Sequence, residues 1–373
     1  MLRIAHISLD EKFIDCAINQ FNSLQNTHST FCVKADGYTL SHIKNSSVKI
    51  FTHETDLIDF INNNNFKFVI LHSLCISPYY LLKLTPQILW CSWGYDIYSD
   101  KSSAVEKIFP LNLLKPLTRA ASFSRPSIKN RFIPYLRKIG IRSTSQKRYD
   151  DFVKKVSYFS VVLPDEFDEA KKKFSHLKFF PFRYIYPKSN AEFKVSNGHC
   201  NSILLGNSLD PNNNHIDLLS ILENKRIKCT AYIPISYPNN QEKYKEHLKS
   251  FVQKLRFVSV RFLENFIPRE EYFKIIDDCN IAIFGHIRQQ ATGNIFHMFY
   301  GGKKVFFFQD SLNYKYLKKM GFKIFCIEND LSTDVISTNL NEKFQKNNFH
   351  LAQKFEEYNQ YLFQLQSFFN NLM

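Results

Sequence analysis

The sequence predicts an α/β protein built from two parallel-sheet domains in series. Short apolar runs alternate with helical patterns along most of the chain, and this alternation is typical of strands covered by helices on both faces of a sheet. The alternation stops at a polar stretch, 187–201, and then starts again, which indicates a domain boundary. The length of 373 residues also fits two domains, at roughly 150 residues each.

The first half opens on a strand. The N-terminal segment MLRIAHISLDEKF turns polar soon after its apolar run, so it reads as a strand rather than as a signal peptide. Apolar runs predict strands at 2–8, 30–34, 48–51, 66–72, 87–93 and 158–163. Between several of them we expect helices at 11–24, 55–62 and 165–174. A last apolar segment, 177–182, precedes the polar stretch.

The second half repeats the alternation. We expect strands at 202–206, 228–235, 258–263, 281–284, 304–308 and 323–327. Helices are expected at 215–222, 240–255, 269–279 and 314–320, with one more after Gly293. The end of the chain, rich in Phe, Leu and Gln, predicts a terminal helix. The predicted domains are therefore 1–185, with a basic insertion at 113–149, then 186–340, and a C-terminal helix at 341–373.

The composition allows two folded cores. Hydrophobic residues make up 44% of the chain, and with only 10 Gly a low-complexity disordered protein is not expected. No apolar run reaches the roughly 18 residues that a membrane-spanning helix needs. The eight cysteines are scattered, mostly within apolar segments, with no CxxC pair and no Cys/His cluster. We therefore expect buried free thiols in a reducing cytosol.

Positive charge is concentrated in one segment. The net charge of +15 indicates an anionic partner. The segment 115–148 has no acidic residue and contains Lys115, Arg119, Arg125, Lys129, Arg131, Arg137, Lys138, Arg142, Lys147 and Arg148. Apolar and aromatic side chains are interleaved with them, and such a basic amphipathic segment is typical of contact with an anionic membrane surface. The alternatives are a solvated basic excursion and a nucleic-acid patch. No RNP-type, helix-turn-helix or zinc-finger pattern is present, so we expect no nucleic-acid partner.

Two donor-rich turns carry the strongest functional signal. They are Gly206-Asn207-Ser208, after the run 203–205, and 288–293, with Arg288, Gln289, Gln290 and Gly293, after the run 281–284. In a parallel α/β domain such turns lie at the carboxyl ends of strands, where ligands bind. Backbone N–H groups beside a helix N-terminus suit a phosphate, and an Arg can grip a diphosphate at two points. The turns predict a nucleotide-diphosphate site, with ordinary capping by Asn and Ser as the alternative.

Six short motifs follow one another along the chain. LLGNSLDPNNNHIDLL, AYIPISYPNNQEKYKEHL and CNIAIFGHIRQQATGNI contain a Gly-Asn-Ser turn, an Asn-x-His, a Pro-x-x-Tyr-Pro segment and an Arg-Gln-Gln-x-x-Gly turn. Upstream, WCSWGYDIY contains Trp-Gly-x-Asp-x-Tyr, and FFPFR contains Phe-Pro-x-Arg. In this order and spacing they resemble glycosyltransferase family 56, the TDP-4-acetamido-4,6-dideoxygalactose (TDP-Fuc4NAc) transferases of enterobacterial common antigen synthesis. The resemblance spans nearly the whole chain, but the basic stretch is longer than this family leads us to expect.

The resemblance implies a GT-B glycosyltransferase, with two Rossmann-like domains facing a cleft. It implies transfer of a 4-acetamido-4,6-dideoxyhexose from a TDP-sugar to a glycan on undecaprenyl diphosphate. The TDP-sugar is then a co-substrate, and no other cofactor is expected. The implied location is the cytoplasmic face of the bacterial inner membrane, as a peripheral protein. An anionic, amphiphilic acceptor agrees with an anionic membrane contact through 115–148.

Further residues are expected around the nucleotide sugar. His215, at a helix start, is expected to donate to a phosphate or the nucleoside, and Tyr237 to close over the nucleotide. Glu264 is expected near the base, and Arg183 near the domain junction. For His215 the structural alternative is a surface His beside a cap, for Tyr237 a Tyr in a Pro-fixed turn, and for Arg183 a structural salt bridge. We take Arg288 to be an exposed loop arginine that stabilises charge on the leaving TDP.

The acceptor side is expected in the N-terminal half. Asp96 follows a strand in the Trp93-Gly94-Tyr95-Asp96 segment and is a candidate general base for the acceptor hydroxyl, with a buried loop-capping Asp as the alternative. His6 and His72 lie at strand ends and are candidates for the base or an acceptor contact, although a lone His in an apolar strand is more often a core residue. No DxD motif is present, and Arg with helix N-termini can neutralise a diphosphate, so we expect no metal.

Two other kinds of function remain open. Another nucleotide-sugar transferase, for lipopolysaccharide O-antigen, would share all donor features. A non-catalytic GT-B-like protein that binds polyanions would explain the basic charge but not the two turns. It predicts salt-sensitive binding to RNA or lipid without a role for Arg288.

Overall fold

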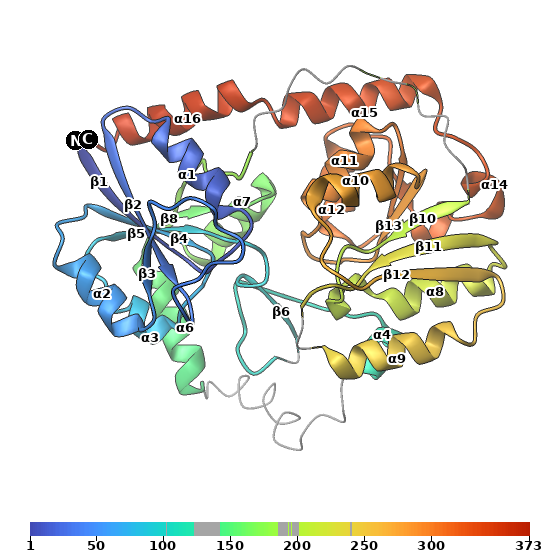
Figure 1. Ribbon diagram of the computed structural model, residues 1–373, viewed down its shortest axis with the longest axis horizontal. Coiled ribbons are helices and arrows are strands. Elements are labelled where there is room, and N and C mark those ends of the chain that lie inside the picture. The colour runs from blue at the N-terminus through green and yellow to red at the C-terminus, as the bar shows by residue number, and fades with distance from the viewer. Residues whose placement is uncertain (102, 123–141, 186–192, 194, 196–200, 239–240) are drawn as a thin grey trace. The chain divides into compact units, whose positions relative to one another are not determined.

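The computed structural model describes residues 1–373 except 102, 123–141, 186–192, 194, 196–200 and 239–240 (Figure 1). The chain forms two compact units, and neither is continuous in sequence. Unit 1 comprises Met1–Pro110, Asn130–Ser189 and Glu356–Met373, and unit 2 comprises Leu111–Lys129 and Asn190–Phe355.

Unit 1 is built on a seven-stranded parallel sheet in the order β3-β2-β1-β4-β5-β8-β9. The strands are β1 (Leu2–Ser8), β2 (Thr27–Lys34), β3 (Lys49–Phe51), β4 (Phe68–His72), β5 (Gln87–Cys91), β8 (Val156–Ser160) and β9 (Lys178–Phe179). The helices are α1 (Ile14–Asn22), α2 (Glu54–Asn62), α3 (Pro78–Leu81), α6 (Thr144–Lys155), α7 (Pro164–Lys173) and α16 (Tyr358–Asn370). The chain runs outward from β1 to β3 and then returns to β4, so the strand order reverses between β1 and β4.

The core of unit 1 includes both ends of the chain. Apolar side chains of β1 and β4, including Ile4 and Ile70, pack with Phe21 of α1 and with Leu365 and Phe369 of α16. The Phe21 and Phe369 ring centroids lie 5.8 Å apart. Burying each such ring stabilises the fold by roughly 1.5–3 kcal/mol. The C-terminal helix α16 is therefore an integral part of unit 1.

Unit 2 has a six-stranded parallel sheet in the order β12-β11-β10-β13-β14-β15. The strands are β10 (Ser202–Leu205), β11 (Cys229–Pro234), β12 (Val258–Leu263), β13 (Ile281–Phe284), β14 (Lys304–Phe307) and β15 (Phe325–Cys326). The helices are α4 (Pro116–Ser122), the 3₁₀ turn η1 (Pro211–Asn213), α8 (His215–Asn224), α9 (Glu242–Val252), α10 (Arg269–Asp277), α11 (Thr292–Tyr300), α12 (Leu312–Lys319), α13 (Ile327–Asp330), α14 (Thr333–Ile336) and α15 (Glu342–Phe355).

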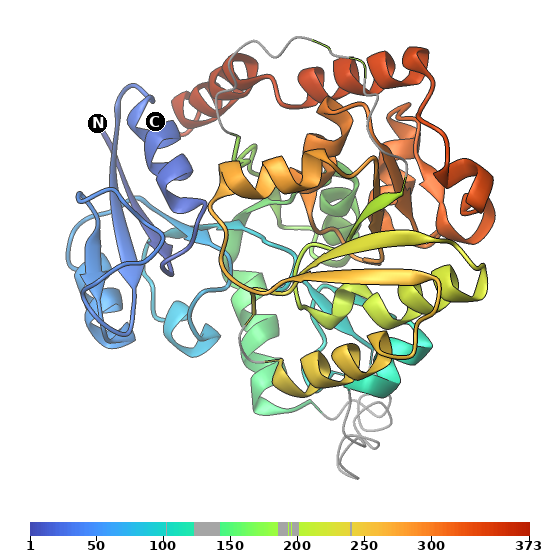
Figure 2. The ribbon, with the colours of Figure 1, turned by 45° about the vertical axis from the view of Figure 1, so that its right-hand side comes forward.

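Helices cover both faces of the unit 2 sheet. Figures 1 and 2 show α8 and α9 on one side and α10, α11 and α12 on the other. Ile203 and Ile283 of the central strands pack with Leu219 of α8 and Leu248 of α9. The direction in which successive strands are added to the sheet reverses between β10 and β13, as it does between β1 and β4 in unit 1. Each unit therefore has the Rossmann-like order in which ligands bind at the carboxyl ends of the two central strands.

Most predicted elements are present, and the differences are local. Strands β1, β12 and β13 have the predicted bounds. The sequence did not predict the short helices α3, α4, α13 and α14, the helix α6, or the two-stranded pair of β6 (Tyr98–Asp100) and β7 (Phe109–Leu111). The terminal segment 341–373, expected as one helix, is α15 in unit 2 and α16 in unit 1.

The units also differ from the contiguous domains 1–185 and 186–340. The segment Leu111–Lys129 groups with unit 2 because α4 is tied to α8: the backbone N–H groups of Leu117 and Thr118 donate to the Asp217 carboxylate at 3.0 and 2.7 Å. None of the helices that the structure describes combines the length and the apolar character that crossing a membrane requires.

Candidate active site

The two donor-rich turns lie side by side at the carboxyl edge of unit 2. Strands β10 and β13 are neighbours, with Leu205 opposite Ile283. The residues that follow them, from Gly206 and from Gly285, therefore meet where the strand order reverses, and the Gly206 N–H donates to the Ile283 carbonyl at 3.0 Å. This is the position at which open parallel sheets bind ligands.

Two glycines let the start of α8 approach these strand ends. Gly206 has φ +72°, and a Cβ there would lie 2.7 Å from Asn213 Oδ1 and 2.9 Å from His215 Nε2. A Cβ on Gly285 would lie only 2.2 Å from the Asn213 carbonyl oxygen. We expected the absence of a side chain at Gly206 to make room for a phosphate. In the structure, Asn213 and His215 approach the position that a Cβ of Gly206 would take. Gly285 was not predicted, although its position directly after an apolar strand was a usable signal.

A hydrogen-bond network centred on Asn213 and Asn207 joins the two turns. Asn213 Oδ1 accepts from the Asn207 N–H at 2.9 Å, and Asn213 Nδ2 donates to the carbonyls of Ser208 and Asp210 at 3.1 and 2.9 Å. Asn207 Oδ1 accepts from Gln290 Nε2 at 3.0 Å. The network holds Asn207 and Gln290, from different turns, as one rigid group.

His286 completes this network as an uncharged ring. Its Nε2 lies 3.0 Å from Asn207 Oδ1 and 2.7 Å from Asn213 Oδ1. Both partners are amide oxygens, so Nε2 carries the proton and Nδ1 is bare. Burial lowers the pKa of His286 well below its usual value, and the nearby Arg288 charge lowers it further. Within the described part of the chain, Nδ1 is buried without a hydrogen-bond partner. His286 was missed because its role depends on residues far away in sequence.

Arg288 is buried, so the expectation of an exposed loop arginine is wrong. It is 6% exposed, and its Nη2 lies 3.1 Å from Asp210 Oδ2, while Nη1 donates to the Gln289 carbonyl at 3.1 Å. Its carboxylate partner Asp210 comes from the segment after β10, the strand that neighbours β13. Gln289 is also buried and donates through Nε2 to Thr292 Oγ1, in the first turn of α11, at 2.6 Å. The edge therefore presents a fixed guanidinium beside a helix N-terminus.

His215 and Tyr237 lie at the same edge in different settings. His215 starts α8 as predicted, but it is fully buried rather than at the surface, and its Nδ1 lies 3.0 Å from the Tyr244 hydroxyl. Burial lowers the pKa of His215 to about 4, so the ring is neutral at pH 7. Tyr237 is 45% exposed, and Asn207 Nδ2 lies 3.5 Å from its hydroxyl. Gly293 lies in the first turn of α11 with open space where a Cβ would be.

Glu264 and Arg183 are placed elsewhere. Glu264 follows β12, two strands from β10, and pairs with Lys249 at 2.8 Å and Lys245 at 3.4 Å on α9. The hydrogen bond from Lys249 lowers the pKa of this exposed carboxyl. Arg183 belongs to unit 1, where its guanidinium lies 5.8 Å from the Tyr361 ring centroid. Glu264 thus follows a strand at the far end of the unit 2 sheet order from β13, and Arg183 belongs to the other unit.

In unit 1, His6 and His72 form one buried pair. His6 Nδ1 and His72 Nε2 are 3.0 Å apart, and both side chains are at most 1% exposed. Burial lowers the pKa of both, that of His72 to about 3, so neither ring is charged at pH 7. The pair extends through His72 Nδ1 to the Tyr184 hydroxyl at 2.6 Å, which also accepts from Trp93 Nε1 at 2.9 Å. Tyr184 was not predicted as a site residue.

Asp96 has no exposed surface. Its Oδ2 accepts from the Leu74 N–H and from Trp90 Nε1, each at 3.0 Å, and Oδ1 accepts from the Trp93 N–H at 2.9 Å. Burial raises the pKa of Asp96 in opposition to these hydrogen bonds. The geometry fits the loop-organising alternative, since the carboxylate orders the segment that carries Trp93. Glu11, after β1, is a half-buried carboxylate whose pKa burial also raises, and it was not predicted.

Only the ends of the basic segment 115–148 can be placed, because 123–141 lies outside the described residues. Lys115 pairs with Asp310 at 3.0 Å, and Arg142 pairs with Asp150 at 2.5 Å. Among the residues that are described, no three His, Cys, Asp or Glu side chains gather in the way that a metal ion requires.

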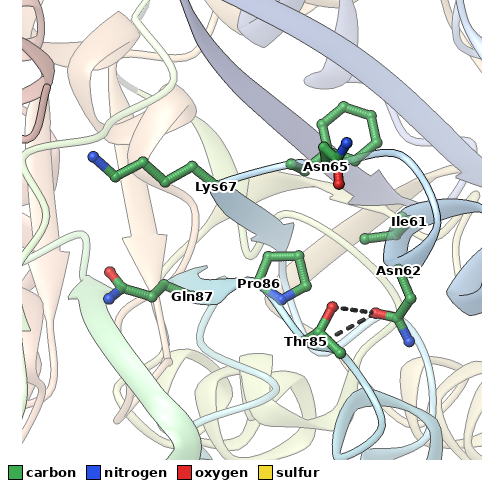
Figure 3. A pocket seen from close by; sticks show the side chains of 8 residues that line it. Ile61, Asn62, Asn65, Lys67, Thr85, Pro86 and Gln87 are labelled. Atoms are coloured by element: carbon green, nitrogen blue, oxygen red, sulfur yellow. Dashed lines mark hydrogen bonds between the residues drawn. The ribbon is translucent and has the colours of Figure 1, made fainter.

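A pocket lies at the opposite edge of the unit 1 sheet, at the amino ends of β4 and β5 (Figure 3). It is lined by Ile61, Asn62, Asn65, Phe66, Lys67, Thr85, Pro86 and Gln87. Asn62 Oδ1 closes one side by accepting from the N–H and hydroxyl of Thr85 at 2.9 and 3.0 Å. None of the candidate site residues lines it, so it does not extend the site.

Solved structures with the same fold are glycosyltransferases of the GT-B class. HepE from Anabaena, in complex with UDP-glucose, matches with a TM-score of 0.61 at 10% identity, covering 100% of both chains. A UDP-forming α,α-trehalose-phosphate synthase from Burkholderia vietnamiensis matches with a TM-score of 0.62 at 8% identity, covering 99% of each. WaaG, a glycosyltransferase of lipopolysaccharide biosynthesis, matches with a TM-score of 0.50 at 10% identity, covering 96% of this chain and 95% of its own. At these identities the likeness shows the GT-B fold.

The family follows from the sequence. The family described as 4-alpha-L-fucosyltransferase, glycosyl transferase group 56, matches residues 145–365. This range includes Asn207, Asp210, Gln290 and Arg288, and also Tyr184. The chain therefore belongs to glycosyltransferase family 56.

Proposed function

We propose that the protein transfers Fuc4NAc from a TDP-sugar to a glycan on undecaprenyl diphosphate, as a peripheral protein at the cytoplasmic face of a bacterial inner membrane. The observation that carries the proposal lies where β10 and β13 end: Asn207 and Gln290 are hydrogen-bonded to each other, and Arg288 is held by Asp210. The turns that form it are the ones that resemble the TDP-Fuc4NAc transferases. Membership of a nucleotide-sugar glycosyltransferase family supports the same chemistry.

The donor is bound through the carboxyl edge of unit 2 in this proposal. Negative charge builds on TDP as the bond to the sugar breaks. Arg288 stabilises it from a fixed position, because Asp210 and the Gln289 carbonyl hold the guanidinium and leave further N–H groups for the diphosphate. The N-terminus of α11, open at Gly293, adds backbone N–H groups. Charge stabilisation of this kind needs no metal ion.

The acceptor hydroxyl is deprotonated from unit 1. Asp96 acts indirectly, by ordering the Trp93 segment through its three hydrogen bonds. Glu11, after β1, is a carboxylate with partial access to solvent, and its raised pKa suits a general base, whereas the pKa of its neighbour Asp10 is lowered. His6 and His72 take no proton directly from substrate, because both are buried.

The basic segment 115–148 provides the membrane contact. Its ten basic residues suit both an anionic lipid surface and the diphosphate of the acceptor. The ion pairs of Lys115 and Arg142 take up part of this charge within the protein, which leaves the contact to the residues between them.

Nucleotide titration tests the donor assignment. TDP, UDP and GDP are titrated separately into the full-length protein by calorimetry, and we expect TDP to bind most tightly. Transfer is then measured with TDP-Fuc4NAc and a lipid-linked acceptor. Tight UDP or GDP binding with none of TDP overturns the donor. Salt-sensitive RNA binding without any nucleotide binding supports the polyanion-binding alternative instead.

A further inference from the structure

Three aromatic rings gather at the carboxyl edge of unit 1. Phe13 precedes α1, Trp93 follows β5, and Tyr184 contacts His72 at the end of β4. Ring centroids are 5.8 Å apart for Phe13–Trp93 and for Phe13–Tyr184, and 5.6 Å apart for Trp93–Tyr184. Phe13 is 46% exposed, and the other two are half-buried. Three separate segments thus contribute rings to one partly open cluster.

One direction of the Tyr184 hydroxyl satisfies every hydrogen in its hydrogen-bond chain. Trp93 Nε1 is only a donor, so the phenol oxygen accepts from it. If Tyr184 donates to His72 Nδ1, then His72 Nε2–H donates to His6 Nδ1, and His6 Nε2–H donates to Ser29 Oγ at 3.2 Å. Every hydrogen in the chain then has an acceptor. In the reverse direction, Tyr184 would accept from both Trp93 and His72, and its own hydrogen would have no partner among the described residues.

This chain leaves one lone pair of Tyr184 unused. The phenol oxygen accepts once from Trp93 and donates once to His72, and the described residues supply no second donor to it. His6 and His72 set the geometry from the interior, and both stay uncharged because they are buried. The result is a hydrogen-bond acceptor of fixed direction, surrounded by aromatic faces.

We propose that the cluster of Phe13, Trp93 and Tyr184 is a saccharide subsite for the acceptor glycan. A pyranose ring has an apolar C–H face and a rim of hydroxyl groups. Phe13 and Trp93 supply apolar surface for the face, and the free lone pair of Tyr184 accepts from one hydroxyl. A purely apolar ligand would gain nothing from a buried polar chain that orients Tyr184. His6 and His72 are positioning residues. The proposal rests on the proposed function only for the source of the saccharide.

The two tryptophans allow a direct test with an internal control. The chain contains only Trp90 and Trp93, so a ¹⁵N-indole spectrum has two N–H signals. Trp90 Nε1 donates to buried Asp96, whereas Trp93 Nε1 donates to Tyr184. Methyl glycosides of glucose, galactose and N-acetylglucosamine are titrated into the full-length protein without donor. We expect at least one to shift the Trp93 signal saturably while the Trp90 signal stays in place.

Tyr184→Phe removes the hydroxyl and keeps the ring. It is expected to weaken saccharide binding about tenfold, the effect of one lost hydrogen bond. Tyr158→Phe, at a tyrosine that packs against Phe368, is the matched control and is expected to leave binding unchanged. Equal affinity in Tyr184→Phe and wild type overturns the proposal, as does the absence of a Trp93 shift with every glycoside. A Trp93 shift with phosphatidylglycerol vesicles and none with glycosides assigns the cluster to lipid instead.

The outcome is separable from that of the proposed function. The titration needs neither TDP nor turnover, so a protein that fails to bind TDP is still tested. If wild-type enzyme transfers sugar, Tyr184→Phe is expected to raise the KM for the acceptor about tenfold and to leave the KM for the donor unchanged. Normal transfer together with an unresponsive Trp93 retains the proposed function and rejects the subsite.

Discussion

Arg288 holds its charge in a buried place with one carboxylate partner. Asp210 is itself partly exposed, with 26% of its side chain accessible, so the pair is desolvated mainly on the arginine side. A buried charge that loses its partner is costly, and this gives Arg288 a structural role beside any catalytic one. The structural role requires the ion pair with Asp210, whereas the catalytic role requires only the positive charge of Arg288. Variants at the two positions can therefore distinguish these roles.

Arg288→Ala is expected to lower both stability and donor binding. Leaving Asp210 unpaired should cost roughly 2–3 kcal/mol, below the ~3–5 kcal/mol of a fully buried pair because Asp210 reaches solvent. Transfer should fall about 10²–10³-fold if the guanidinium stabilises the leaving diphosphate. Urea unfolding and initial transfer rates measure the two effects separately.

Asp210→Asn separates the roles. It also breaks the ion pair, but it keeps the positive charge, so a diphosphate should bind at least as well as in wild type. Equal loss of TDP affinity in Asp210→Asn and Arg288→Ala would show that Arg288 acts only by holding Asp210.

The sequence predicted which turns form the site but not how they are joined. Asn207, Gln290 and Arg288 follow apolar runs, and that local pattern was enough to place them at a sheet edge. His286, Asp210 and Tyr184 were missed, since each owes its role to partners far away in sequence; His72 and Tyr184 are 112 residues apart. The sequence also did not reveal burial: Arg288 was expected at the surface, because polar side chains in loops usually are, and a surface position was the alternative considered for His215.

At the scale of elements, buried parallel strands were the easiest to predict. Strands such as β4 and β13 are buried at every position, so they read as continuous apolar runs bounded by polar residues. Short helices such as α3 and α13, with four residues each, are too short for a helical period. The break between α15 and α16 carries two glutamates and no Pro or Gly, so no strong breaker marked it.

The basic segment gives a prediction for membrane binding. Replacing Arg131, Arg137 and Lys138 with Gln is expected to reduce binding to phosphatidylglycerol vesicles by roughly 3 kcal/mol, since each basic residue near such a surface contributes about 1 kcal/mol. High salt should have the same effect through screening. Vesicle sedimentation measures both.

A control variant removes the same charge elsewhere. Lys171, Lys172 and Lys173 are exposed at the end of α7, and their replacement with Gln should change vesicle binding much less. Equal losses in the two triple variants would mean that net charge, rather than this segment, drives the contact.

At the scale of the whole molecule, each unit keeps two neutral histidines next to its central strands. They are His6 and His72 in unit 1 and His215 and His286 in unit 2, and each is at most 1% exposed. Burial lowers the pKa of all four, to about 3 for His72 and about 4 for His215. The arrangement suits hydrogen-bond networks at pH 7, and it makes both units sensitive to acid.

Mild acid is therefore expected to destabilise the protein. Below pH 6.5 the unfolded chain protonates these histidines while the folded chain does not, so the free energy of unfolding falls as pH falls. Well below pH 6.5, each buried histidine lowers the free energy of unfolding by about 1.4 kcal/mol for every further pH unit. The two histidines of one structural unit together lower it by about 3 kcal/mol for every pH unit. Stability from this source is complete above pH 6.5 and is lost between pH 6.5 and the lowered pKa values. Urea midpoints at pH 7.5, 6.5 and 5.5 measure this loss of stability.

Two variants serve as controls. His72→Asn should flatten the dependence of stability on pH, and His350→Gln, at an exposed position, should leave it unchanged. Stability that stays constant or rises from pH 6.5 to 5.5 would show that the histidines are charged in the folded protein, and the hydrogen directions derived for His6, His72 and Tyr184 would then be wrong.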